Sequence, residues 1–98
     1  MVWFKTIDHQ GQEIEIASID DMNAVVDAFE LRLDHLALLL EGADRNARVR
    51  AAAEYRAMVT RRDRIEADAR KAEERATRDS DDDYHRALAK AIRTRTRE

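Results

Sequence analysis

The chain has 98 residues, of which 40% are charged, with a net charge of −3, two Gly, no Pro and no Cys. A composition so rich in Ala, Glu, Asp and Arg predicts a mostly helical protein and excludes an all-β sandwich or barrel. The absence of Cys excludes a disulfide scaffold and any zinc or iron–sulfur site held by thiolates.

Two features of the sequence predict a cytoplasmic protein. The longest apolar run is Leu36–Leu40, five residues, which is far too short to span a membrane. The first residues, Met1–Asp8, lack the basic and apolar regions of a signal peptide. We therefore expect a cytoplasmic domain with no membrane partner and no cofactor.

Charge and bulk are divided unevenly along the chain. Residues 1–44 carry a net charge of −8, whereas residues 45–98 carry +5. Of the 26 apolar side chains larger than Ala, 18 lie in the first 40 residues. We therefore expect the core in the N-terminal half and an Arg-rich arm in the C-terminal half. The 15 Arg against 3 Lys indicate a high-GC genome. A small accessory protein of a phage, a mobile element or a high-GC bacterium would fit this composition.

The first predicted element is a β-hairpin. Val2–Ile7 is aromatic and β-branched, and Gln12–Ala17 alternates between polar and apolar residues. The loop Asp8–Gly11 between them carries turn residues, and Gly11 suits a positive φ. An isolated hairpin is marginally stable, so we expect it to pack through Trp3 and through Ile14 and Ile16.

A helix is predicted to follow from Ser18 to Glu41. Ser18 is a good N-cap, and Asp21 completes a capping box. Gly42 is expected to end the helix in the left-handed conformation. Apolar residues recur at spacings of four and three, which is a heptad seam. The seam consists of Met22, Val26, Phe29, Leu33, Leu36 and Leu40.

A second helix is predicted to begin at Asp44, after a three-residue connection that indicates an antiparallel, coiled-coil-like helical hairpin. Because the apolar positions beyond Ile65 are all Ala, residues 68–79 are expected to project by about 18 Å unless the β-hairpin or a second chain covers them. Ala69 would then lie on the projecting part. The seam of this helix consists of Ala51, Tyr55, Met58, Arg62, Ile65, Ala69, Ala72 and Ala76.

A short third helix is predicted from about Asp81 to Arg93, because Ser80 and Asp83 form a second capping box. This helix would carry Tyr84, Leu88 and Ile92 on one stripe and end in a basic tail. We therefore divide the chain into residues 1–80, the two hairpins, and residues 81–98. The alternative is one long helix that continues through residue 80.

The first helix carries a second apolar stripe, which needs a second partner. Either the β-hairpin or another subunit must cover it, and we expect a homodimer or higher oligomer. His35 within the stripe is either a pH-sensitive interface residue or a solvated residue beside Asp34. The predicted oligomer interface consists of Ala24, Ala28, Leu31, His35 and Leu38.

No arrangement of residues predicts catalysis or a metal site. The two Ser residues, Ser18 and Ser80, lie at predicted helix caps, and both Gly are isolated from any phosphate-binding loop. His85 is four residues from Asp81, but capping of the third helix explains that acidic cluster without a metal. We therefore expect a protein that is not an enzyme.

Basic residues along the second half of the chain are candidate contacts with a polyanion or a protein partner. Interleaved acidic residues favour a solvent-exposed helix held by i,i+4 ion pairs over a strong nucleic-acid site. The sequence thus predicts a self-associating protein-interaction or assembly module, and the alternative is a small nucleic-acid-binding protein. The candidate contacts are Arg61, Arg64, Arg75, Arg78, Arg86, Lys90, Arg93, Arg95 and Arg97.

Overall fold

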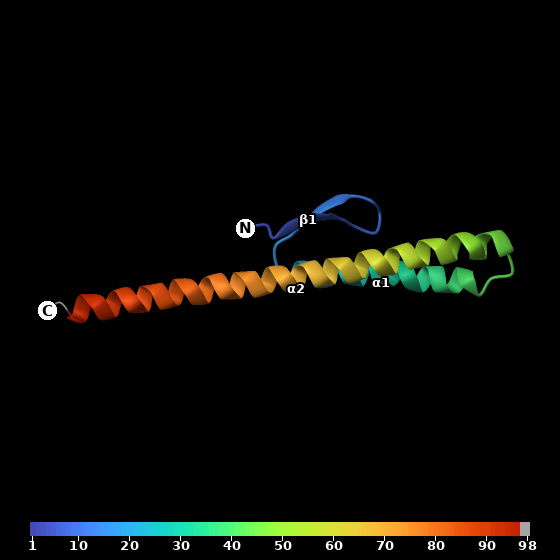
Figure 1. The fold of residues 1–98 in the computed structure, drawn as a ribbon. Helices are drawn as coiled ribbons and strands as arrows, with labels where there is room; N and C mark the ends of the chain where they lie inside the picture. The colour runs from blue at the N-terminus through green and yellow to red at the C-terminus, as the bar shows by residue number, and fades with distance from the viewer. Residues whose placement is uncertain (97–98) are drawn as a thin grey trace.

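The computed structural model describes the backbone of residues 1–96 and the side chains of residues 1–93. Its elements are β1 (Phe4–Ile7), β2 (Glu13–Ile16), α1 (Ile19–Leu40) and α2 (Arg45–Thr96). In Figure 1, α1 runs back along the first half of α2, the β-hairpin lies over the pair, and the rest of α2 extends alone. The predicted helical hairpin is therefore confirmed.

The molecule is strongly elongated, with extents of 82 × 20 × 15 Å. Its radius of gyration is 21.5 Å, whereas a compact domain of this length has about 13 Å. The C-terminal part of α2 causes this difference, because it continues past the end of α1 (Figure 1). The chain therefore exposes far more surface than a globular domain of its size.

The β-hairpin is confirmed, with strands shorter than predicted. Its antiparallel register places Phe4 opposite Ile16. The turn is held by the Asp8 carboxylate, which accepts hydrogen bonds from two backbone N–H groups of the loop, each at 2.9 Å. Gly11 has the expected positive φ, 83°. Because alternate residues of a strand share a face, Phe4, Ile14 and Ile16 all face the helices, and Ile16 is fully buried.

Helix α1 begins with the predicted capping box. The Ser18 hydroxyl accepts a hydrogen bond from the Asp21 N–H at 3.1 Å, which satisfies one of the free donors of the first turn. The Asp21 carboxylate accepts a hydrogen bond from the N–H of Ala17 at 2.9 Å, one residue before the cap. The two bonds fix the direction in which the chain passes from β2 into α1.

The expectation for Gly42 is wrong, because the only glycine with a positive φ among the described residues is Gly11. The chain leaves α1 through a right-handed turn, in which Glu41 has φ −86° and ψ −6° and Gly42 donates to the carbonyl of Leu39 at 3.2 Å. The Arg48 guanidinium donates to the Gly42 carbonyl at 3.0 Å. The Gly42 carbonyl therefore has a hydrogen-bond partner although Gly42 is not in the left-handed conformation.

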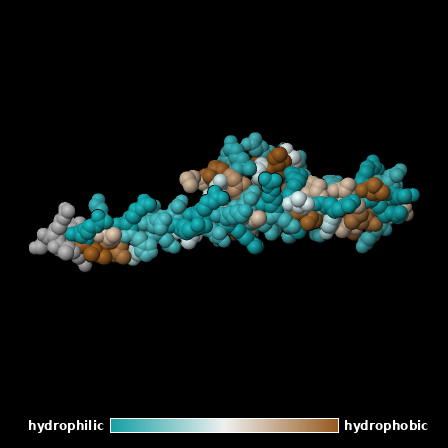
Figure 2. Space-filling view, viewed as in Figure 1, coloured by the Kyte–Doolittle hydropathy of each residue, from teal (hydrophilic) through white to brown (hydrophobic). Residues whose placement is uncertain are grey.

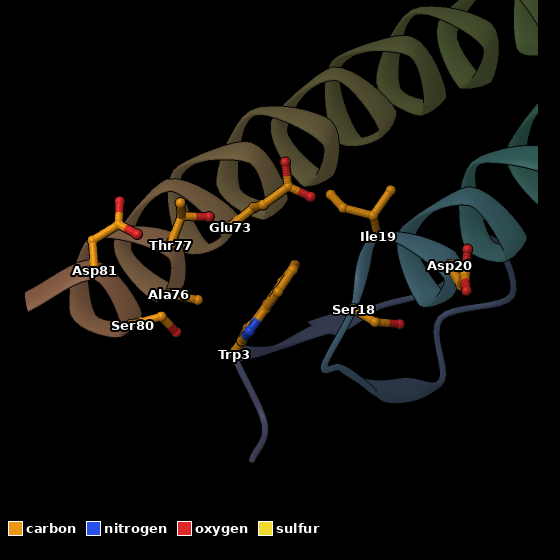
Figure 3. A pocket seen from close by; sticks show the side chains of 9 residues that line it. All are labelled: Trp3, Ser18, Ile19, Asp20, Glu73, Ala76, Thr77, Ser80 and Asp81. Carbon is orange, nitrogen blue, oxygen red and sulfur yellow. The ribbon is translucent and has the colours of Figure 1, made fainter. Parts of the chain in front are cut away.

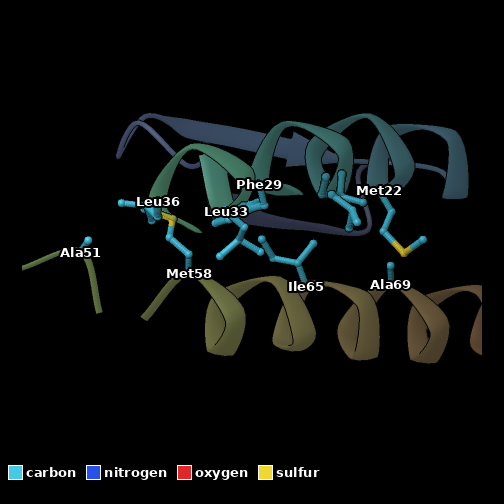
Figure 4. Close-up of a cluster of buried hydrophobic side chains, with 10 residues drawn as sticks. Met22, Phe29, Leu33, Leu36, Ala51, Met58, Ile65 and Ala69 are labelled. Carbon is cyan, nitrogen blue, oxygen red and sulfur yellow. The ribbon is translucent and has the colours of Figure 1, made fainter. Parts of the chain in front are cut away.

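The core is the predicted seam of α1 packed against α2 and β2 (Figure 4). Leu33 and Leu36 of α1 face Met58 and Ile65 of α2 in this view. Leu40, at the end of the seam, is half-buried. The buried side chains are Ile16, Met22, Val26, Phe29, Leu33, Leu36, Ala51, Met58, Ile65 and Ala69.

The placement of Ala69 on a projecting segment is wrong, because Ala69 is fully buried. Figure 4 shows Met22 of α1 facing it. Farther along α2, Trp3 and Phe4 of the β-hairpin approach Ala72. Met22 thus covers Ala69, while Trp3 and Phe4 line a small cavity together with Ala72. The β-hairpin covers this part of α2, and the uncovered segment begins near residue 77.

The separate third helix is wrong, and the alternative, one long helix that continues through residue 80, is confirmed. Helix α2 continues without interruption from Arg45 to Thr96, across the expected boundary between residues 80 and 81. Its start is the one predicted, since the Asp44 carboxylate accepts hydrogen bonds from the N–H groups of Asn46 and Ala47 at 2.9 and 3.3 Å. Ser and Asp each cost less than about 0.7 kcal/mol inside a helix, and no Gly or Pro follows Asp44 to end the preceding one.

Truncation of the seam should strongly destabilise the fold. Leu33→Ala removes a buried side chain at the α1–α2 contact, so we expect the free energy of unfolding to fall by about 2–5 kcal/mol in chemical denaturation. Ala57→Ser, at an exposed position of α2, is the control and should change it by less than about 1 kcal/mol. A larger effect of the control would contradict the assignment of the core.

Candidate protein-interaction surfaces

The second stripe of α1, here called the outer face (Ala24, Ala28, Leu31, His35 and Leu38), lies opposite the buried seam. At 100° per residue, its members point about 160–240° away from Met22. Leu31 and Leu38 are 73% and 69% exposed. Ala24 and His35 are also exposed, and Ala28 is half-buried. The β-hairpin therefore does not cover this face, and the structure leaves an apolar stripe on the surface.

One border of the outer face is acidic. Asp20, Asp27, Asp34 and Glu41 recur every seven residues, and all four are exposed. We call these four residues the acidic edge. The acidic edge was not predicted from the sequence, although its seven-residue interval is visible there. The outer face therefore carries a continuous negative charge along one side.

The opposite border consists of Val25, Arg32 and Leu39, here called the neutral edge. The Arg32 guanidinium donates to both carboxylate oxygens of Glu54 on α2, with N–O distances of 2.8 to 3.0 Å. This bidentate pair balances the charge on the neutral edge, and it ties α1 to α2 outside the core. The two borders of the outer face thus differ sharply in charge.

The segment of α2 beyond the hairpin, residues 77–96, is here called the arm. Tyr84, Leu88 and Ile92 are 65%, 45% and 56% exposed. Figure 2 shows apolar surface near the C-terminal end of α2, set in a largely hydrophilic surface. Residues 84–96 include four basic residues and no acidic one. The arm is therefore amphipathic and positively charged toward its end.

The predicted basic contacts are spread along the length of α2, and some of them are paired with acidic residues. Arg64 lies 4.0 Å from Asp68, and Arg86 lies 3.9 Å from Asp83. Of the remaining residues, Arg75, Arg78, Lys90 and Arg93 are all exposed. The side chain of Arg95 and the whole of Arg97 lie outside the described part of the chain.

Arg61 has a structural role that distinguishes it from the other basic residues. Its guanidinium donates to the backbone carbonyls of Ile7, at 3.1 Å, and of Asp8. It also lies over the Phe29 ring, 5.3 Å from the centroid, while His9 meets the same ring at 6.2 Å. Arg61 therefore holds the turn of the β-hairpin against both helices.

A shallow hollow of about 460 Å³ lies where the open end of the β-hairpin meets α2 (Figure 3). The indole of Trp3 points into it, between Ile19 of α1 and Ala76 of α2. The Ser18 hydroxyl at its rim already accepts the capping bond from Asp21. The hollow is lined by Trp3, Ser18, Ile19, Asp20, Glu73, Ala76, Thr77, Ser80 and Asp81.

Within the described residues, no three acidic or His side chains are grouped so as to hold a metal ion. His85 packs edge-to-face on Tyr84, with 5.9 Å between ring centroids. No helix in the described part of the chain is long and apolar enough to cross a membrane. The surfaces that remain as candidates are the outer face and the arm.

Comparison of the chain with known protein families, with curated proteins and with solved structures found no match. Function is therefore inferred from the surfaces of the chain itself.

Removal of the Arg61 contacts should release the β-hairpin. Arg61→Met loses the bonds to the two turn carbonyls and the charge over Phe29, so we expect a stability loss of about 1–3 kcal/mol. Trp3 is the single tryptophan and is half-buried, so its fluorescence emission should shift to the red as the hairpin detaches. Arg64→Met, at an exposed position one turn farther along α2, is the control. Unchanged emission in Arg61→Met would show that the hairpin packs without this residue.

Proposed function

We propose that this protein is a non-enzymatic interaction or assembly module of the cytoplasm that self-associates through the outer face of α1. The observation that carries the proposal is the exposure of Leu31 and Leu38, 73% and 69%, on a helix whose opposite face is already buried. Two leucines at heptad spacing are a typical helix-pairing pattern. Small helical proteins commonly supplement a limited core in this way.

The energetics allow a reversible dimer. Full burial of a leucine side chain contributes about 1.5–3 kcal/mol, so four leucines in a symmetric contact contribute on the order of 6–12 kcal/mol. Loss of overall freedom on association costs about 4–15 kcal/mol. At the favourable ends of both ranges the net is about −8 kcal/mol, which corresponds to a Kd of about 1 μM, so we expect a reversible dimer at micromolar concentrations. We interpret the α1–α2 pairing within each chain as coiled-coil-like, because the seams of both helices follow heptads.

The arm supports a second candidate function, binding of nucleic acid. Arg86, Lys90 and Arg93 are exposed on a stretch without acidic residues. The rest of α2 is less suited to phosphate contacts, because residues 44–79 hold 11 basic and 8 acidic side chains, a net charge of +3. We therefore propose protein interaction as the main function and expect nucleic-acid binding to be weak.

Charge placed on the outer face should abolish self-association. In the double variant Leu31→Glu, Leu38→Glu, two carboxylates would have to be buried in the contact, where an unpaired charge is costly. Sedimentation should show a wild-type dimer or higher oligomer at tens of micromolar and a monomeric variant. Tyr84→Glu with Leu88→Glu, two exposed positions on the arm, is the matched control and should still associate. A wild-type monomer under these conditions would refute the proposal.

Nucleic-acid binding should depend on low salt. Because few phosphates can be neutralised, we expect electrophoretic shifts of duplex DNA or RNA only at low ionic strength, with loss near physiological salt. Deletion of residues 93–98 should abolish the shift, whereas Arg64→Gln should preserve it. Sub-micromolar, sequence-selective binding at physiological salt would instead favour the nucleic-acid function.

A further inference from the structure

We infer that α1 pairs with α1 of a second copy in parallel, with the acidic edge of each helix beside the neutral edge of the other. This inference rests on the proposed self-association and adds its orientation. It concerns the two borders of the outer face, which the proposed function does not use. A parallel pair would also determine where the two arms point.

The outer face fits the core positions of a two-stranded heptad. With Leu31 at d, Leu38 and Ala24 also fall at d, while Ala28 and His35 fall at a. Leucine at d is favoured in parallel dimers, and one polar residue at a commonly fixes the register. His35 is the single polar residue among these five. Leu31 and Leu38 at d therefore fit a parallel pair, and the borders of the outer face are needed to decide the orientation.

The borders then decide the orientation. In this heptad the acidic edge occupies g and the neutral edge occupies e. In a parallel pair, g of one helix lies beside e of the other, five residues farther along, which places Asp27 beside Arg32 of the partner subunit. In an antiparallel pair, g lies beside g, so two rows of four exposed carboxylates would face each other. Like charges placed opposite each other are destabilising, so the parallel pair is favoured.

A parallel pair places both arms at the same end of the dimer. Helix α2 lies on the far side of α1 from the outer face, so the order across the dimer is α2, α1, α1 and α2. At 8–10 Å between neighbouring helix axes, the two arms start roughly 24–30 Å apart. Two equal, similarly directed surfaces bind a repeated or extended partner with avidity, which neither arm has alone.

Single cysteines test the orientation cleanly, because the chain contains none. Ala24→Cys and Leu38→Cys lie near opposite ends of the outer face. In a parallel pair each position meets itself, so each variant alone should form a disulfide-linked dimer as its main product under mild oxidation. Asn23→Cys is the matched control, since it is exposed on the same helix but points about 100° away. It should form little covalent dimer.

The outcomes separate the orientation from self-association itself. If wild-type protein sediments as a dimer and covalent dimer forms only when a cysteine at d is mixed with one at a, as in Ala24→Cys with His35→Cys or Leu38→Cys with Ala28→Cys, the pair is antiparallel, so the inference fails and the proposed function stands. If the wild type is a monomer at tens of micromolar, both fail. If the wild type is a dimer and no cysteine on the outer face forms a covalent dimer, the interface lies elsewhere, and both fail.

Charge reversal at the acidic edge gives an independent test. In a parallel pair, Asp27→Lys faces the neutral edge of the partner subunit, where Glu54 balances Arg32, so the dimer Kd should change by less than about threefold. In an antiparallel pair the same lysine would face carboxylates, and the Kd should fall. Glu30→Lys, exposed on α1 away from the contact, is the control and should leave the Kd unchanged. A Kd lowered by more than about threefold in Asp27→Lys would overturn the inference.

Discussion

The Phe29 ring is fully buried at the place where α1, α2 and the β-hairpin meet. The Arg61 guanidinium of α2 lies over one side of the ring, and His9 of the hairpin turn meets it edge-on. Arg61 also binds two turn carbonyls, so the burial of one aromatic side chain is coupled to the position of a whole element. A two-stranded hairpin is marginal alone, and this contact gives it a fixed place.

The position of the hairpin determines which surfaces stay exposed. Its large side chains, Trp3 and Phe4, lie against the Ala-rich stretch of α2, where α1 no longer supplies bulk. A hairpin held there cannot also cover the far side of α1, so Leu31 and Leu38 remain on the surface. The exposure of the outer face is thus a consequence of how the core is completed. The β-hairpin has only four residues in each strand, so it cannot cover both the Ala-rich stretch of α2 and the outer face of α1.

Features encoded locally could be predicted from the sequence, and those decided by distant contacts could not. The Ser18 cap and the α1 seam follow from spacing over a few residues, and both are confirmed. The burial of Ala69 depends on side chains 47 or more residues away, which no local pattern shows. The prediction that a new helix begins at Ser80 was wrong for another reason. A capping residue starts a helix only where the preceding helix has ended, and α2 does not end there. The outer face was predicted as an interface from its apolar stripe. Its acidic edge can be recognised only when the residues that flank the stripe are also examined.

The continuous α2 also keeps the basic end of the arm away from the acidic edge of α1. The first 44 residues carry −8, and residues 84–96 of the arm include four basic and no acidic side chains, so this end of the arm and the acidic edge attract each other. For the arm to fold back onto α1, the helix would have to break near residue 80, and no Gly or Pro lies there. The stiff helix therefore holds the two charges apart within one molecule. Each of the two charged surfaces is therefore open to an oppositely charged surface on another molecule.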